Sequence, residues 1–159
     1  VEGLPLKILG DGPSRVELEV QARQQGLAVE FLGFRPHEEI LRIVGKAEFQ
    51  IIPSEWYEGS PMVVLEAYAC GTPIVSSRIG SLNELIIEGE TGTKFDAGNS
   101  RDMAEKINAI CADRVALAKM RRKARAVFNE KYTSERNYVM LTAIYDGVID
   151  DYKKSRKGG

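Results

Sequence analysis

The chain has 159 residues, of which 43% are hydrophobic and 28% are charged, and its formal net charge at pH 7 is −1. This composition is typical of one ordinary folded domain that can form a core, and the near-neutral charge gives no reason to expect a nucleic-acid partner. No apolar run approaches the roughly 20 residues that a membrane-spanning helix needs. We expect one domain over residues 1–152 and a polar tail over residues 153–159.

Short apolar runs alternate with amphipathic stretches from the first residues onward. This alternation predicts an α/β fold of three layers, in which helices cover both faces of a mostly parallel sheet. Ser14 and Glu17 have the spacing of a capping box, and Gly26 is a typical stop for the helix that they begin. The predicted strands cover residues 6–9, 29–32, 49–52, 74–76 and 93–95, and the predicted helices between them cover residues 14–25, 36–46 and 61–70.

The rest of the chain is predicted to be helical, over residues 100–111, 114–129 and 133–152. The last of these helices has an apolar stripe, and the polar tail after it is expected to fray. Cys70 and Cys111 lie in apolar helical contexts, which favours buried thiols over a disulfide or a metal site. The stripe consists of Leu141, Ile144, Tyr145, Val148 and Ile149.

Two carboxylates mark the stretch PSEWYEGSPMVVLEAYACGTPIV, residues 53–75. Glu66 is the one charged residue in the otherwise apolar run 61–70, which predicts a buried helix. Glu58 lies eight positions earlier, before Ser60 as the predicted N-cap and Pro61 as the predicted first helical residue. The spacing predicts Glu58 in the loop before the helix and Glu66 about a turn and a half inside it.

The start of this helix has the chemistry of a nucleotide-sugar site. The free amides of Met62 and Val63 favour an anion such as phosphate, and carboxylates accept hydrogen bonds from paired hydroxyls. A phosphate group flanked by a ribose and a hexose would satisfy both kinds of group. The spacing alone leaves a structural role open, in which Glu58 lies near the cap and Glu66 pairs with a buried arginine or a backbone donor.

The segment EGSPMVVLEAYACGTPIV resembles the donor-binding signature of retaining glycosyltransferase family 4, of the two-domain GT-B type. That signature has two glutamates separated by seven residues, followed by small residues and a G-x-P motif. The segments LKILGDGP, VEFLGF and GSLNELIIEGETG also follow in family order, so the resemblance covers essentially the whole chain. It implies the Rossmann-like carboxy-terminal half of a GT-B fold, which lacks its first strand and helix. The matching residues are Glu58, Glu66, Ala67, Gly71, Pro73, Ile74 and Val75.

The resemblance implies a role for each candidate site residue. Glu58 is expected to be catalytic and to hold hydroxyls of the donor sugar, and Glu66 is expected to hold the ribose diol. The other residues are expected to bind the diphosphate, to shape the loops of the site or to flank the base. These donor-binding candidates are Gly12, Phe34, Arg35, Gly59, Ser60, Met62 and Val63. No metal ligand is expected.

Some positions keep two interpretations. Gly12 belongs to a loop that is either a tight turn before a helix or a phosphate-binding loop. The absence of the third glycine of a G-x-G-x-x-G motif weakens the phosphate-binding interpretation. Trp56 and Tyr57 either line the sugar pocket or anchor the loop. His37, at the start of a predicted helix, is expected to be a solvated first-turn residue.

The resemblance implies a function for the parent protein. We expect transfer of a hexose from a UDP- or GDP-sugar to a hydroxyl acceptor, with retention of configuration and without a cofactor or metal. The expected process is cell-surface polysaccharide synthesis, and the expected location is the cytoplasm. Association with the inner face of the membrane is expected only through other parts of the parent protein. This chain alone, without an amino-terminal acceptor domain, is expected to bind the donor weakly and to be inactive. Two alternatives stay open: a stand-alone nucleotide-sugar-binding partner of a split transferase, and a nucleotide-sugar epimerase of the same architecture.

Overall fold

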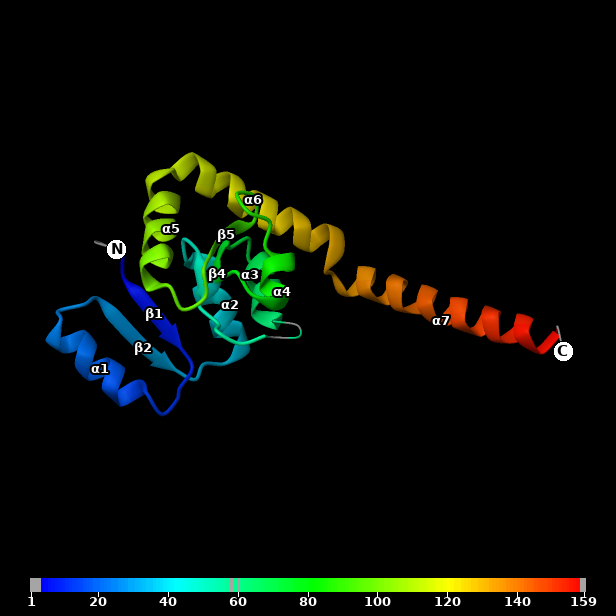
Figure 1. Ribbon diagram of the computed structural model, residues 1–159, viewed down its shortest axis with the longest axis horizontal. Coiled ribbons are helices and arrows are strands. Elements are labelled where there is room, and N and C mark those ends of the chain that lie inside the picture. The colour runs from blue at the N-terminus through cyan, green and yellow to red at the C-terminus, as the bar shows by residue number, and fades with distance from the viewer. Residues whose placement is uncertain (1–3, 58, 60, 158–159) are drawn as a thin grey trace.

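A computed structural model describes residues 4–57, 59 and 61–157 of the chain. Strands and helices alternate in the predicted order, with one further helix, α4, that was not predicted, and the chain after the last strand is helical (Figure 1). The elements are β1 (Leu6–Leu9), α1 (Arg15–Gln24), β2 (Val29–Gly33), α2 (His37–Lys46), β3 (Gln50–Ile52), α3 (Met62–Ala69), β4 (Ile74–Ser77), α4 (Gly80–Leu85), β5 (Gly92–Phe95), α5 (Ser100–Ala112), α6 (Arg114–Lys131) and α7 (Ser134–Lys157).

All strand pairs are parallel, as predicted, but the strands are divided between two sheets. β1 pairs with β2, whereas β3, β4 and β5 form a separate sheet with β4 in the centre. We call β1, α1 and β2, residues 4–33, the two-stranded unit, and residues 37–133 the three-stranded body. In Figure 1 the two-stranded unit lies to one side of the three-stranded body.

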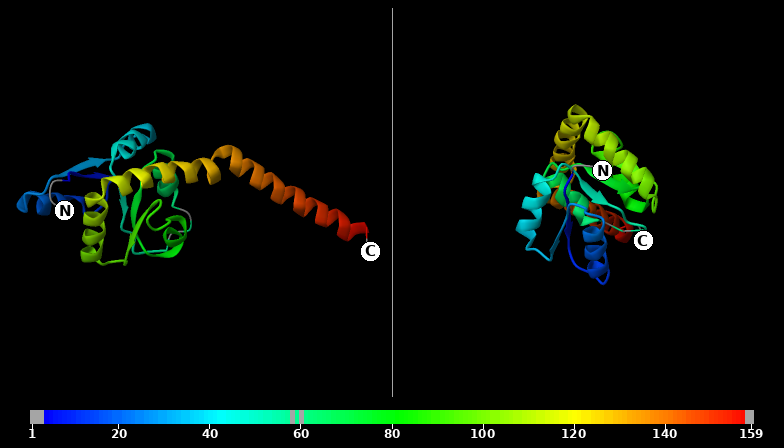
Figure 2. Two further views of the ribbon diagram at one scale, coloured as in Figure 1. Left: turned by 90° about the horizontal axis from the view of Figure 1, so that it is seen from above. Right: turned by 90° about the vertical axis from the view of Figure 1, so that its left-hand side faces the viewer.

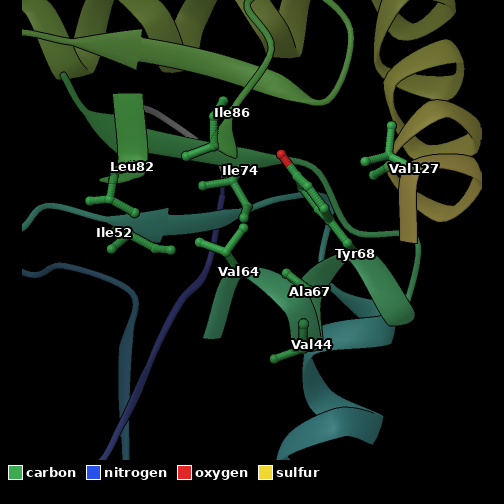
Figure 3. Packing of buried hydrophobic residues seen from close by; sticks show 10 residues of the cluster. Val44, Ile52, Val64, Ala67, Tyr68, Ile74, Leu82, Ile86 and Val127 are labelled. Carbon is green, nitrogen blue, oxygen red and sulfur yellow. The ribbon is translucent and has the colours of Figure 1, made fainter. Parts of the chain in front are cut away.

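Side chains of the central strand β4 alternate between the two faces of the three-stranded sheet. Ile74 packs with residues of α2, α3, α4 and α6, and Figure 3 shows this cluster. Val75 packs on the other face with Phe95 and with residues of α5 and α6. Helices therefore cover both faces of the three-stranded sheet, which is the arrangement that a parallel sheet requires.

Tyr68 lies in the middle of the first cluster and is fully buried. Its hydroxyl donates a hydrogen bond to Thr91 Oγ1 over 2.6 Å and lies 3.1 Å from the Leu85 carbonyl oxygen. Burial raises the pKa of the Tyr68 phenol to about 12. The Tyr68 phenol is thus held neutral and hydrogen-bonded among the residues that form the cluster, as a buried phenol must be.

Two arginines of α6 bind the carboxyl ends of the helices α2 and α3. Arg121 donates to the carbonyl oxygens of Gly45 and Ala47, over 3.1 and 2.6 Å. Arg125, one turn later, donates to the carbonyl oxygen of Ala69. Cations at these ends satisfy free carbonyls and complement the helix dipoles, so α6 holds α2 and α3 from the same side.

The structure corrects three local predictions. Ser14 occupies the N-cap position of α1, but its side chain makes no capping hydrogen bond, so the predicted capping box is wrong. Pro61 has ψ 97° and is the N-cap of α3, so the helix begins at Met62 instead. The polar tail does not fray before Lys157 but continues α7. Lysine and arginine are good helix formers and are favourable near a helix carboxyl end.

The predicted apolar stripe of α7 faces outward. Figure 2 shows α7 continuing away from α6 and from the sheets, and no α7 residue whose burial is described is buried. Leu141 and Ile149 of the stripe are 42% and 49% exposed. Within the described residues, no helix combines the length and the apolar character that crossing a membrane would take.

Both cysteines are free, as predicted, but each is only half-buried. Cys70 Sγ donates to the Leu41 carbonyl oxygen over 3.4 Å, which joins α3 to α2. Partial burial raises the pKa of both the Cys70 and the Cys111 thiols. Their packing therefore favours the thiol form over the reactive thiolate.

Candidate functional site

The candidate site lies where the parallel strands end and the next helices begin. In open parallel α/β folds, ligands bind beyond the carboxyl ends of the strands. Here α2 begins after β2, α3 begins after β3, and the two helices are in contact. The starts of α2 and α3 therefore form one edge of the molecule, and most of the candidate residues lie on them or beside them.

The first turn of α3 is exposed although the whole helix is apolar. Met62 is 60% exposed and Val63 39%, whereas Val64 is fully buried. The prediction of a buried helix is therefore wrong for this turn and correct for the turns that follow. The first amides of a helix have no intrahelical partner, and the N-cap Pro61 makes no side-chain capping bond. The amides of Met62 and Val63 thus retain the anion-binding chemistry that the sequence predicts.

Glu66 lies on the next turn of α3, and its side chain is 26% exposed. Its Oε1 is 3.6 Å from Nδ1 of His37, the first residue of α2. The structural alternative for Glu66 required a buried arginine or a backbone donor, whereas the charged or chargeable side chain found beside Glu66 among the described residues is an exposed histidine. His37 is in the first turn of its helix and 64% exposed at its side chain, as predicted, but its pairing with Glu66 was not predicted.

Phe34 and Arg35 connect β2 to α2 and so lie close in sequence to His37. Phe34 is 81% exposed. Arg35 Nε is 3.5 Å from Glu39 Oε1 within the same helical region. Phe34, a predicted donor-binding residue, and Arg35, which was predicted to flank the base, therefore both lie at the start of α2.

The loop around Gly12 is a less suitable phosphate site than predicted. The Gly12 amide donates to Asp11 Oδ1 over 2.8 Å, so this donor is already used and a carboxylate stands beside it. Arg15 Nη1 is 3.2 Å from Asp11 Oδ2, and its guanidinium lies close over Gly33. Gly33 has φ +66°, a conformation that L side chains rarely adopt, so the site edge of β2 depends on glycine.

The segment before α3 is only partly described. Glu58 and Ser60 lie outside the described residues, so the catalytic role of Glu58 and the donor-binding role of Ser60 remain predictions. The N-cap of α3 is Pro61, so the prediction of Ser60 as the N-cap is wrong. Gly59 is exposed, and a Cβ added to it would meet open space. The Tyr57 ring packs against Gly80, where an added Cβ would lie 3.0 Å from Cδ1. This contact favours the interpretation of Tyr57 as an anchor of the loop.

Two hollows are lined by residues other than the candidate site residues. The larger, of about 340 Å³, lies between α1 and β2 and is lined by Ala22, Leu27 and Phe31 among others. The smaller, of about 110 Å³, lies at the ends of β3 and β5 beside Glu55 and Asn99. Glu66 lines neither of them. Among the described residues, no three His, Cys, Asp or Glu side chains are grouped as metal ligands would be.

The α/β fold and a site at helix amino-termini define a ligand-binding domain of the Rossmann-like class. The chain belongs to the family of glycosyl transferases group 1, whose model matches residues 1–127. It is 35% identical over 125 residues to glycogen synthase of Mycobacterium tuberculosis, a match that covers 77% of this chain and 30% of that protein. It is also 35% identical over 127 residues to D-inositol 3-phosphate glycosyltransferase of Corynebacterium urealyticum, with coverage of 72% and 30%.

Solved structures of GT-B glycosyltransferases share the fold, which confirms the predicted fold class. HepE of Anabaena in complex with UDP has a TM-score of 0.80 and 25% identity, with 91% of this chain and 42% of that chain covered. HepE in complex with UDP-glucose has a TM-score of 0.79 at the same identity. The chain thus spans 30% to 42% of the lengths of these relatives and structures.

Proposed function

We propose that this chain forms the donor-binding part of a retaining glycosyltransferase that moves a hexose from a nucleotide-diphosphate sugar to a hydroxyl acceptor. The observation that supports this most strongly is the partly buried Glu66 carboxylate directly behind the exposed first turn of α3. An anion-binding helix start and a hydrogen-bond-accepting carboxylate in adjacent turns suit a phosphate joined to a ribose. The likeness to HepE, which was solved with UDP and with UDP-glucose, supports the same assignment.

In this proposal each group has one role. The amides of Met62 and Val63 face the diphosphate, and the positive end of the α3 dipole stabilises the charge that develops on it as the glycosidic bond breaks. Glu66 accepts hydrogen bonds from the ribose diol, and Phe34 and Arg35 flank the base. Glu58, by resemblance to the family signature, holds hydroxyls of the donor sugar.

Three further parts of the proposal rest on the family resemblance alone. The transfer proceeds without a metal ion, because the helix start supplies the positive potential. The acceptor is bound by an amino-terminal domain of the parent protein. The parent protein works in the cytoplasm, at the inner face of the membrane, in cell-surface polysaccharide synthesis.

Ligand-observed NMR of this chain with UDP, GDP, UDP-glucose and GDP-mannose tests the proposal. We expect weak binding that prefers one base and is lost in Glu66→Ala, because the ribose then loses its acceptor. Glu105→Ala is the matched control, since Glu105 is an exposed carboxylate on α5 that pairs with Arg101. Absence of binding at millimolar ligand, or equal binding by Glu66→Ala, would contradict the proposed site.

A further inference from the structure

The pair formed by His37 and Glu66 joins two helices at the candidate site. His37 Nδ1 and Glu66 Oε1 are 3.6 Å apart, which is slightly beyond a direct hydrogen bond and within the range of an ion pair when the imidazole is protonated. The residues come from the first turn of α2 and the second turn of α3, and they are separated by 29 positions in the chain. Their approach is therefore a product of tertiary packing.

Two hydrogen bonds near the carboxyl ends of α2 and α3 fix these helices against each other. Cys70 directly follows α3, and its Sγ donates to the Leu41 carbonyl oxygen of α2 over 3.4 Å. Thr72 Oγ1, just after α3, donates to the Val44 carbonyl oxygen of α2 over 2.8 Å. Because these bonds set the spacing of α2 and α3, the distance between His37 and Glu66 depends on rigid elements, as a preorganised site requires.

The cation nearest to His37 in sequence does not pair with Glu66, whereas His37 is in contact with Glu66. Arg35, the nearest cation in sequence, is directed to Glu39 at 3.5 Å. The contact of His37 is with Oε1, and a carboxylate has about four acceptor positions on its two oxygens. Glu66 therefore keeps free acceptor positions for the hydrogen bonds of a ligand diol while the imidazole lies beside Oε1.

We propose that His37 is a positioning residue that orients the Glu66 carboxylate for the ribose 2′- and 3′-hydroxyls, and so sets the preference of the site for ribonucleotides. This inference rests on the proposed function. A positioned carboxylate loses less side-chain entropy when the diol binds. The gain appears only with ligands that have the diol, because a nucleotide without it makes no use of the orientation of Glu66.

The experiment compares UDP with 2′,3′-dideoxy-UDP, and GDP with its dideoxy analogue, by NMR titration of the full chain. We expect His37→Ala to reduce the ratio of ribonucleotide to dideoxynucleotide affinity by about threefold, since exposed pairs contribute modestly. His37→Asn, which keeps a donor near the Nδ1 position, is expected to restore most of the ratio. Glu38→Ala, the next residue on the same exposed turn, is the matched control and should leave the ratio unchanged.

The outcomes separate this inference from the function on which it rests. If the unaltered chain binds ribonucleotides preferentially and His37→Ala keeps the same ratio, the positioning role is wrong and the proposed site stands. If the unaltered chain binds no nucleotide, both are wrong. The affinity for the dideoxynucleotide should be the same in the unaltered chain and in His37→Ala, and a loss of that affinity would show that His37 does not act through Glu66. The midpoint temperature of thermal unfolding should be the same for the unaltered chain, His37→Ala, His37→Asn and Glu38→Ala.

Discussion

The two-stranded unit and the three-stranded body have the same local pattern of strand, helix and parallel strand, yet they are stabilised differently. In the body, residues of both sheet faces are fully buried, as Ile74 and Val75 are. In the described part of the two-stranded unit, only Ala22 and Gly33 are buried, and Val16 of α1 is 72% exposed. A strand–helix–strand pattern therefore predicts the elements but does not predict how much apolar surface they bury.

Charged contacts take a larger part in the two-stranded unit. Lys7 pairs with Glu30 across the two strands, and Arg15 pairs with both Asp11 and Glu19. Exposed pairs of this kind contribute about 0–1 kcal/mol each and weaken with salt. We therefore expect the two-stranded unit to open at a lower free energy than the body, and the following substitutions test this difference.

The largest expected effect is that of Gly92→Ala in the body. A Cβ at Gly92, on strand β5, would overlap the carbonyl oxygen of Ile74 on the neighbouring strand. Because backbone atoms cannot give way cheaply, we expect a loss of at least about 3 kcal/mol in the free energy of unfolding, or no folded protein. Urea unfolding followed by circular dichroism measures the change. Gly12→Ala, where the added Cβ would meet open space, should change it by less than about 0.5 kcal/mol.

An intermediate effect is expected for Tyr68→Phe, which removes the buried hydroxyl and leaves its partners unsatisfied. The cost should be about 1–2 kcal/mol at neutral pH. The pKa of Tyr68 is raised from 10.0 to about 12 in the folded chain, so the folded state binds more protons than the unfolded state between these values. The resulting stabilisation is present below pH 10 and is lost as the pH rises to about 12.

Unfolding curves measured from pH 8 to pH 12 for both proteins isolate this contribution. The difference in stability between the unaltered chain and Tyr68→Phe should shrink as the pH rises through this window. A difference that stays constant up to pH 12 would mean that Tyr68 is not held neutral by burial.

The smallest effect is expected for Val16→Ala in the two-stranded unit. Since Val16 is 72% exposed, the change in unfolding free energy should be below about 0.5 kcal/mol. The same substitution at Val64, which is fully buried in the body, should cost about 2 kcal/mol because it leaves a cavity. Equal costs at the two positions would remove the contrast between the two regions.

The order of the elements follows from the sequence because strands and helices differ in periodicity and in their end signals. Leu6–Leu9 was predicted with its observed bounds, and Gly26, at φ +63°, ends the first helix region as predicted. The short helix α4 was missed, because its six residues GSLNEL are too few to show a period.

Tertiary contacts explain what the sequence could not predict about the site. The exposure of Met62 depends on which elements cover the start of α3, and the pairing of His37 with Glu66 depends on how α2 packs against α3. No local pattern records either fact. The division of the strands between two sheets is likewise a property of their arrangement in space.

The exposure of the site edge also has an evolutionary consequence. Phe34, Met62 and Val63 at this edge are exposed, so replacing one of them costs the fold little. Descendants of this chain can therefore exchange these side chains singly while the inherited scaffold persists. The buried turns of α3, by contrast, leave selection little freedom, so substitutions in this helix should concentrate on its first turn.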